Sequence, residues 1–263
     1  MQVGNIVKGA IEQAWNNKKL WIFGFLSAFS YSFSSDSQNN FLNTFVDQWL
    51  EMICLGIGLT LLSTFFAYGN SRGSLRVIRK EEITLSMVFD DAKYFFTRGL
   101  VLTVIQILIT AALFAVGSGL YAGISSIVQI PYWLAILIAL PISYLFSIYF
   151  AISSMGLVVH DLSVADALRS AWENLASRLG AWIQFAIQLF GVTLAYLVAI
   201  LIAGIVIGAI FFFLAFQFDI VGLILGVVLF VPYIVVITSV GTIAAQITWL
   251  TAYLELSEQG VQE

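Results

Sequence analysis

The residues best suited to acid–base chemistry are the single histidine of the chain, His160, and its neighbour Asp161. A histidine oriented by a carboxylate can act as a general base. This pair, however, stands at the end of a long apolar run, where polar residues of a membrane interface are expected. We therefore favour a structural role, predict no catalytic residue, and rank an enzyme acting on lipid third among the possible functions.

Metal and thiol chemistry have equally few candidates. Asp90 and Asp91 are adjacent, like some metal-binding pairs, but they also fit the polar face of an amphipathic helix. Cys54 lies inside an apolar run, as buried structural thiols do. The sequence has no His or Cys spacing typical of a metal site and no glycine-rich phosphate loop. We expect no metal and no cofactor.

Uncharged polar side chains within apolar runs are the remaining candidates for a site. The glutamines among them are Gln106, Gln184, Gln188 and Gln246. Gln184 and Gln188 are one helical turn apart and therefore share a face. Such side chains either line a path for a solute or form hydrogen bonds between helices, and we favour the second arrangement.

A pair of glycines offers a site of a different kind, for helix packing. Gly204 and Gly208 form a G-x-x-x-G pattern inside an apolar run. Small residues at this spacing allow two helices to approach closely. The pattern predicts close packing either within one chain or between two copies of it.

The elements that hold these residues are predicted from composition and run length. Of the 263 residues, 60% are hydrophobic and 10% are charged, whereas soluble domains carry about 25% charged residues. Six apolar runs without strand-like alternation cover residues 20–33, 52–68, 100–122, 132–159, 181–216 and 220–254. Because about 20 apolar residues span a bilayer, we predict an all-α, polytopic transmembrane helix bundle with six spans. The run 20–33 is short, and whether it crosses fully is open.

The basic residues predict the orientation of these spans. All 11 Lys and Arg residues fall before the first run, between the second and third, or between the fourth and fifth. By the positive-inside rule these segments are cytoplasmic, and six spans then place both termini in the cytoplasm. We expect a multi-pass protein of the cytoplasmic membrane. The net charge of −4 and the absence of a basic face in the sequence argue against nucleic acid as a partner.

Three similar amphipathic segments precede the three pairs of runs. Aligning Ala14, Ala92 and Ala171 gives spacings of 78 and 79 residues. The pattern predicts one integral membrane domain, 1–263, built of three tandem units at about 1–77, 78–160 and 161–263. Each unit is an amphipathic interfacial helix followed by two transmembrane helices, although the leading segments could also be cytosolic extensions or plain loops.

Two features of these leading segments are specific. Trp15 and Trp172 are expected to anchor the first and third segments at the interface. Ser163 and Asp166 fit a capping box at the start of the third helix. Both features predict helices that lie along the membrane surface before turning into a span.

The stretch 158–172 passes from a span through a short polar turn into an A-L-x-S-x-W segment. Residues 84–96 and 248–254 fit the same pattern. The layout resembles a set of uncharacterised bacterial six-helix membrane proteins, which is similar to the membrane domain attached to some glycerophosphodiester phosphodiesterases. In those enzymes the chemistry belongs to a separate soluble domain. The resemblance therefore implies a membrane module without catalytic residues, which binds or presents lipid or a partner.

The leading hypothesis is a non-enzymatic membrane module that acts as a scaffold, a partner subunit or a lipid-interacting component. Its expected partners are membrane lipids, with a protein partner or a second copy of the chain as further candidates. The alternative is a transporter or channel for a small neutral or hydrophobic solute. That alternative needs a continuous polar cavity joining some of the four glutamines.

Overall fold

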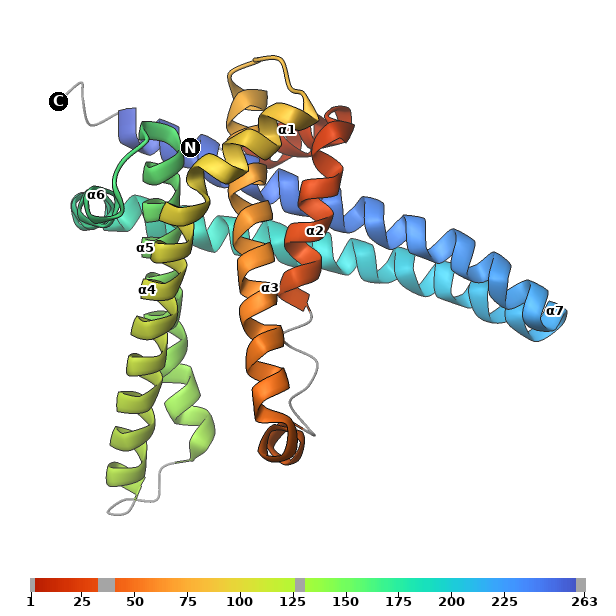
Figure 1. Cartoon of the computed structure of the whole chain (residues 1–263), viewed down its shortest axis with the longest axis horizontal. Coiled ribbons are helices and arrows are strands. Elements are labelled where there is room, and N and C mark those ends of the chain that lie inside the picture. The colour runs from red at the N-terminus through yellow and green to blue at the C-terminus, as the bar shows by residue number, and fades with distance from the viewer. Residues whose placement is uncertain (1–2, 33–40, 126–130, 259–263) are drawn as a thin grey trace. The chain divides into compact units, whose positions relative to one another are not determined.

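The computed structural model describes residues 3–32, 41–125 and 131–258, and among them it contains helices and turns but no strand. The helices, shown in Figure 1, are α1 (Val3–Asn16), the 3₁₀ turn η1 (Lys18–Leu20), α2 (Trp21–Ser32), α3 (Phe41–Ile78), α4 (Leu85–Ser125), α5 (Tyr132–His160), α6 (Val164–Ser177) and α7 (Leu179–Glu258). The all-α prediction is confirmed.

Five segments of the described residues are long and apolar enough to cross a membrane. They are Ile53–Ile78, Leu85–Ser125, Ala139–His160, Leu179–Phe213 and Gly226–Ser257. Large apolar side chains on them are exposed, among them Phe114 and Phe212, each at 75%. Soluble monomers do not expose apolar surface on this scale, so these segments indicate a multi-pass membrane protein.

The predicted first span is represented by α2, which has 12 residues. At 1.5 Å per residue this helix is about 18 Å long, which is shorter than the hydrocarbon core of a bilayer. Phe33, the last residue of the predicted run, lies outside the described residues. The described part of this run is therefore too short to count among the five segments.

Helix α7 carries two of the five segments and doubles back on itself (Figure 1). The Tyr233 hydroxyl donates to the Ile200 carbonyl at 3.3 Å, although the two residues are 33 positions apart. A straight helix would separate them by roughly 50 Å. The rings of Phe211 and Phe230 also lie 6.4 Å apart. The two apolar segments of α7 therefore run antiparallel to each other, as two separate runs in the sequence require.

The described residues divide into two compact units, and the first comprises 1–94 together with 183–263. Its core is a cluster of apolar side chains contributed by α1, η1, α2, the end of α3, the start of α4 and the second half of α7. The members are Ala10, Ala14, Leu20, Phe23, Val77, Ile83, Val88, Ala92, Val240, Ile243, Ala244 and Ile247. Because six elements meet in one cluster, the amphipathic α1 is packed onto the ends of the apolar helices.

Small residues permit the closest helix contacts in this first unit. A Cβ atom added at Gly69 of α3 would lie 2.8 Å from the Phe23 ring, and one at Gly73 would lie 2.5 Å from Leu20. These two glycines form a G-x-x-x-G pattern at the packing surface between α2 and α3. By contrast, nothing lies within 4 Å of such an atom at Gly204 or Gly208. Among the described residues, that second pattern makes no close helix contact.

The second unit, residues 95–182, is organised around the turn between α5 and α6. Arg98 of α4 donates to the backbone carbonyls of Asp161 and Leu162 at 3.3 and 3.2 Å. The Tyr149 hydroxyl of α5 donates to the Leu168 carbonyl of α6 at 3.1 Å. These bonds hold α6 against α5 at the point where the chain reverses.

The start of α6 agrees with the predicted capping pair. The Ser163 hydroxyl accepts a hydrogen bond from the Asp166 backbone N–H at 3.2 Å. An N-cap bond of this kind satisfies one of the unpaired N–H groups at a helix start. The N-cap half of the predicted capping box is thus confirmed, while the Asp166 carboxylate accepts a hydrogen bond from the Ser163 hydroxyl at 2.6 Å.

We expect Gly24→Ala and Gly69→Ala each to destabilise the protein by about 1–3 kcal/mol. At Gly24 the added methyl would lie 2.8 Å from the Ser239 carbonyl oxygen, and at Gly69 it would meet the buried Phe23 ring. The measurement is the thermal unfolding midpoint of each purified variant in one detergent.

The matched control is Gly58→Ala, also in α3, where nothing lies within 4 Å of the new atom. Removing a helical glycine there is expected to be neutral or to stabilise by roughly 0.5–1 kcal/mol. Equal midpoints for Gly58→Ala and Gly69→Ala would contradict close packing of α2 on α3.

Candidate functional site

The four glutamines singled out from the sequence fall in different environments. Gln106, Gln184 and Gln188 are exposed on apolar helices. Gln246 of α7 is partly buried, and its side-chain N–H donates to the Ser71 hydroxyl of α3 at 2.8 Å. The structure therefore does not bring all four together, and Gln246 forms an interhelical hydrogen bond.

Ser71 belongs to a buried polar stretch of α3 that sequence reasoning missed. Asn70 is 2% exposed and Ser74 is fully buried, and neither Asn70 Oδ1 nor Ser74 Oγ has a hydrogen-bond partner among the described residues. The sequence signal was the polar run N-S-R-G-S after the second apolar run. This run lies in the segment that the positive-inside rule places in the cytoplasm, and α3 continues through it as a helix to Ile78.

The direction of Asn70 and Ser74 follows from their neighbours on α3. Gly69 and Gly73 face α2, while Ser71 faces α7 through Gln246. At about 100° per residue, positions 70 and 74 lie between these two directions. Both polar side chains therefore lie on the part of the α3 surface between the side that faces α2 and the side that faces α7.

The His160–Asp161 pair lies at the end of α5. Asp161 adopts a left-handed conformation with φ 54°, which ends the helix. Its carboxylate lies 2.8 Å from Arg98 Nη2 in an ion pair. Asp tolerates this backbone conformation better than most residues, so its position and its ion pair both serve the turn between α5 and α6.

One hollow of the first unit lies between two short connections, and the first of these follows α3. Lys80 has a positive φ of 57°. The Glu81 N–H donates to the Arg76 carbonyl at 2.9 Å, and the Lys80 N–H donates to Val77 at 3.1 Å. This is the bond pattern of a Schellman C-cap, which turns the chain sharply out of the helix. Residues 81–84 follow this turn.

The same connection ends at the start of α4. The Thr84 hydroxyl accepts from the Met87 N–H at 3.3 Å, which makes Thr84 the N-cap of α4. Ile83 is buried in the core cluster. Residues 81–84 are thus held at both ends and in the middle, so they form a defined wall of the hollow.

The second wall is the junction of α1 and α2. The Asn17 side-chain N–H donates to the Gln13 carbonyl at 2.8 Å, and the Trp21 indole donates to Ala14 at 3.0 Å. The Trp21 bond pairs the Ala14 carbonyl at the end of α1, and the Asn17 side chain adds a second bond to the Gln13 carbonyl, which also accepts from the Asn17 backbone N–H at 3.1 Å. They hold η1, and with it Lys18 and Lys19, at the mouth of the hollow.

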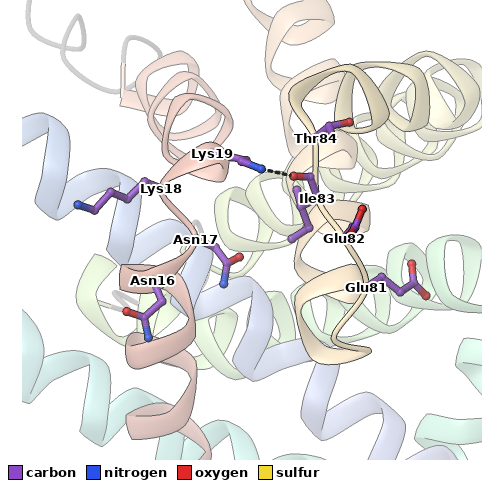
Figure 2. Close-up of a pocket in the computed structure, with 8 residues that line it drawn as sticks. All are labelled: Asn16, Asn17, Lys18, Lys19, Glu81, Glu82, Ile83 and Thr84. Carbon is purple, nitrogen blue, oxygen red and sulfur yellow. Dashed lines mark hydrogen bonds between the residues drawn. The ribbon is translucent and has the colours of Figure 1, made fainter.

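The hollow between the two walls has a volume of about 610 Å³. It is lined by Asn16, Asn17, Lys18, Lys19, Glu81, Glu82, Ile83 and Thr84. Figure 2 shows Lys19 reaching across to Ile83, and its ammonium donates to the Ile83 carbonyl at 2.8 Å. Lys18 and Glu81 point outward at opposite edges. The volume lies within the roughly 300–1,000 Å³ typical of small-molecule sites.

The charges around the hollow are not all equally free to bind a ligand. Arg76 holds Asp91 through two hydrogen bonds of 2.8 and 3.1 Å and also lies 3.3 Å from Glu81. The Glu81 carboxylate is therefore partly neutralised. Lys18, Lys19 and Glu82 supply the other charges of the lining, which can pair with both signs of charge in a ligand.

The two tryptophans predicted as anchors lie on α1 and α6. Trp15 is 53% exposed and Trp172 is 65% exposed. The Trp15 ring also lies 5.5 Å from the Trp21 ring, between centroids. Each indole is therefore exposed on one side of its helix, while the opposite side of α1 is buried in the first unit and that of α6 in the second unit.

Two serines one turn apart on α3 are expected to respond in opposite ways to the same substitution. Ser71→Ala removes the bond from Gln246 and should destabilise the protein by about 1 kcal/mol. Ser74→Ala removes a buried hydroxyl without a partner and should stabilise it by a similar amount. Thermal unfolding in one detergent checks both, and a loss of stability in Ser74→Ala would show that this hydroxyl has a bound partner.

Comparison of the chain with known protein families, with curated protein sequences and with solved structures finds no match in any of them. The function of the protein is therefore inferred from the contacts, burial and charges of the described residues.

Proposed function

We propose that this protein is a non-enzymatic module of the cytoplasmic membrane that interacts with lipid at the cytoplasmic surface. The observation that carries the proposal is the arrangement of α1 and α6. Each helix buries an alanine face, with Ala10 and Ala14 in α1 and Ala167 and Ala171 in α6. Each also exposes a tryptophan next to a buried alanine, and indole side chains prefer the headgroup level of a bilayer.

A structural role for the His160–Asp161 pair supports the non-enzymatic part of this proposal. The Asp161 carboxylate is engaged by Arg98 at 2.8 Å. The carboxylate thus stabilises the turn after α5, which accounts for it without catalysis.

We propose further that the chain consists of three tandem units. The aligned residues Ala14, Ala92 and Ala171 are each at most 1% exposed. The residues four positions before them, one helical turn earlier, are Ala10, Val88 and Ala167, and these are equally buried. An equivalent packing position in each segment is what a repeated helix predicts.

Six spans also follow from the proposal, with the run 20–33 making the first crossing. Leu20 packs near Gly73, and Phe23, further along the chain, packs near Gly69. Because the later residue, Phe23, contacts the earlier glycine, Gly69, α2 runs antiparallel to α3. From Gly73 back to Ile53, where the apolar segment of α3 begins, the helix covers roughly 30 Å at 1.5 Å per residue. This is about the thickness of a bilayer core, so a run that starts at Leu20 and leads antiparallel to this segment is proposed to cross the same core.

The orientation is part of the same proposal. Lys18 and Lys19 of η1 lie with the end of α3, because Lys19 donates to Ile83. Arg76, Arg79 and Lys80 belong to that end of α3 as well. The positive-inside rule puts these groups in the cytoplasm together, and six crossings return the C-terminus to the same side.

Brominated lipids should quench the fluorescence of Trp15 and Trp172 in vesicles that contain the protein. Quenching by lipids brominated near the headgroup should exceed quenching by lipids brominated at the chain end, since both indoles are expected at the interface. Variants that keep one tryptophan at a time, with the others replaced by Phe, isolate each signal. The buried Trp182, kept alone, is the control with weaker quenching. Signals for Trp15 and Trp172 no stronger than that of Trp182 would contradict the proposed position.

Single cysteines introduced on a Cys54→Ser background test the first crossing. Glu12→Cys in α1 should react with a membrane-impermeant maleimide only from the cytoplasmic side, and Asn43→Cys in α3 only from the outside. Lys93→Cys, exposed on α4, serves as the cytoplasmic reference. If Glu12→Cys and Asn43→Cys react from the same side, the run 20–33 does not cross the membrane and the six-span proposal fails.

A further inference from the structure

The hollow described above lies at the ends of apolar helices. Glu81–Thr84 begins three residues after Ile78, the last residue of the apolar segment Ile53–Ile78. On the other wall, η1 leads directly into the apolar α2, which begins at Trp21. The wall at η1 is therefore directly next to the apolar start of α2, and the hydrogen bond from Lys19 to the Ile83 carbonyl brings the other wall to the same level. This is the level at which phospholipid headgroups lie.

The charges of the hollow favour a ligand with both signs. Glu81 is engaged by Arg76 at 3.3 Å, which leaves two ammonium groups, of Lys18 and Lys19, and the carboxylate of Glu82. Lys19 uses one N–H to bond the Ile83 carbonyl, and an ammonium group has three donors. Among the described residues, Lys18 and Glu82 make no ion pair.

A phosphodiester that carries an amine matches this arrangement. The phosphate accepts charge-assisted hydrogen bonds from the lysine ammonium groups, and the amine donates to a carboxylate. An anionic headgroup without an amine would use the lysines but would be repelled by Glu82. A headgroup with a quaternary amine has no N–H to donate to Glu82.

We propose that this hollow binds the phosphoethanolamine headgroup of a membrane phospholipid, with the phosphate at Lys19 and at Lys18, whose exposed side chain turns inward from its outward position in Figure 2, and with the ammonium at Glu82. The inference rests on the proposed function, because it requires this end of the protein to lie at the lipid surface. It adds to that function the class of lipid and the residues that select it.

Native mass spectrometry of the full-length protein tests the inference, with phosphatidylethanolamine, phosphatidylglycerol and phosphatidylcholine titrated into detergent solution. Phosphatidylethanolamine should be retained most strongly. Lys18→Gln should weaken retention of phosphatidylethanolamine and phosphatidylglycerol by about two- to fivefold each, the range for exposed ion pairs. Glu82→Gln should weaken phosphatidylethanolamine retention by a similar factor while strengthening that of phosphatidylglycerol, which reverses the preference.

Lys8→Gln is the matched control, since Lys8 is exposed on α1 but does not line the hollow. This variant should leave the order of the three lipids unchanged. Equal retention of the three lipids by the unmodified protein would overturn the inference, and so would retention that Lys18→Gln does not weaken or an order of lipids that Glu82→Gln does not change.

Soluble glycerophosphoethanolamine provides a second arm, because the same headgroup chemistry could come from a free metabolite. Displacement of bound phosphatidylethanolamine by millimolar amounts of this compound supports headgroup recognition. Binding of the soluble compound without any binding of the lipid would overturn a lipid site. The tryptophan quenching experiment distinguishes the headgroup inference from the proposed function. If Trp15 is quenched as expected but the three lipids are retained equally, the headgroup inference is rejected and the proposed interaction with the membrane surface stands.

Discussion

The close contact of α2 with α3 at Gly69 and Gly73 is the interaction on which the rest of the first unit depends. Because a glycine has no side chain, Phe23 and Leu20 can pack directly on the α3 backbone. Leu20 and Phe23 in turn belong to the cluster that holds α1, the start of α4 and the second half of α7. A larger residue at Gly69 would displace α2 and, with it, the wall of the hollow that carries Lys18 and Lys19.

The basic residues have a structural role in addition to their effect on orientation. Arg76 lies within α3 and joins it to Asp91 of α4 by a two-bond ion pair. Arg98 lies within α4 and holds the turn after α5. Charged groups near a membrane surface are costly to bury alone, so each arginine is placed where a carboxylate or carbonyl group can pair with it. Such pairing tightens the ends of the apolar helices.

The molecule therefore has two chemically different surfaces. The apolar helices expose large side chains such as Leu108 and Phe114 along their length, and that surface is suited to lipid chains. The ends of the same helices in the first unit carry a polar hollow with both signs of charge. In the function proposed above, the protein contacts lipid chains without selectivity and headgroups with selectivity, because only the headgroups differ in hydrogen-bonding chemistry.

The sequence by itself determined the helical class, the apolar segments and the capping pair at Ser163, because these depend on composition and on spacing along one helix. It also located the amphipathic segments whose alanines are buried. Only the tertiary structure decided which G-x-x-x-G pattern packs, since Gly69–Gly73 meets α2 whereas Gly204–Gly208 meets no other helix among the described residues. The same is true of the hollow, whose walls meet through Lys19 and Ile83, which are 64 positions apart in the chain. Such contacts depend on which helix faces approach each other, and a pattern local to one segment carries no information about its partner.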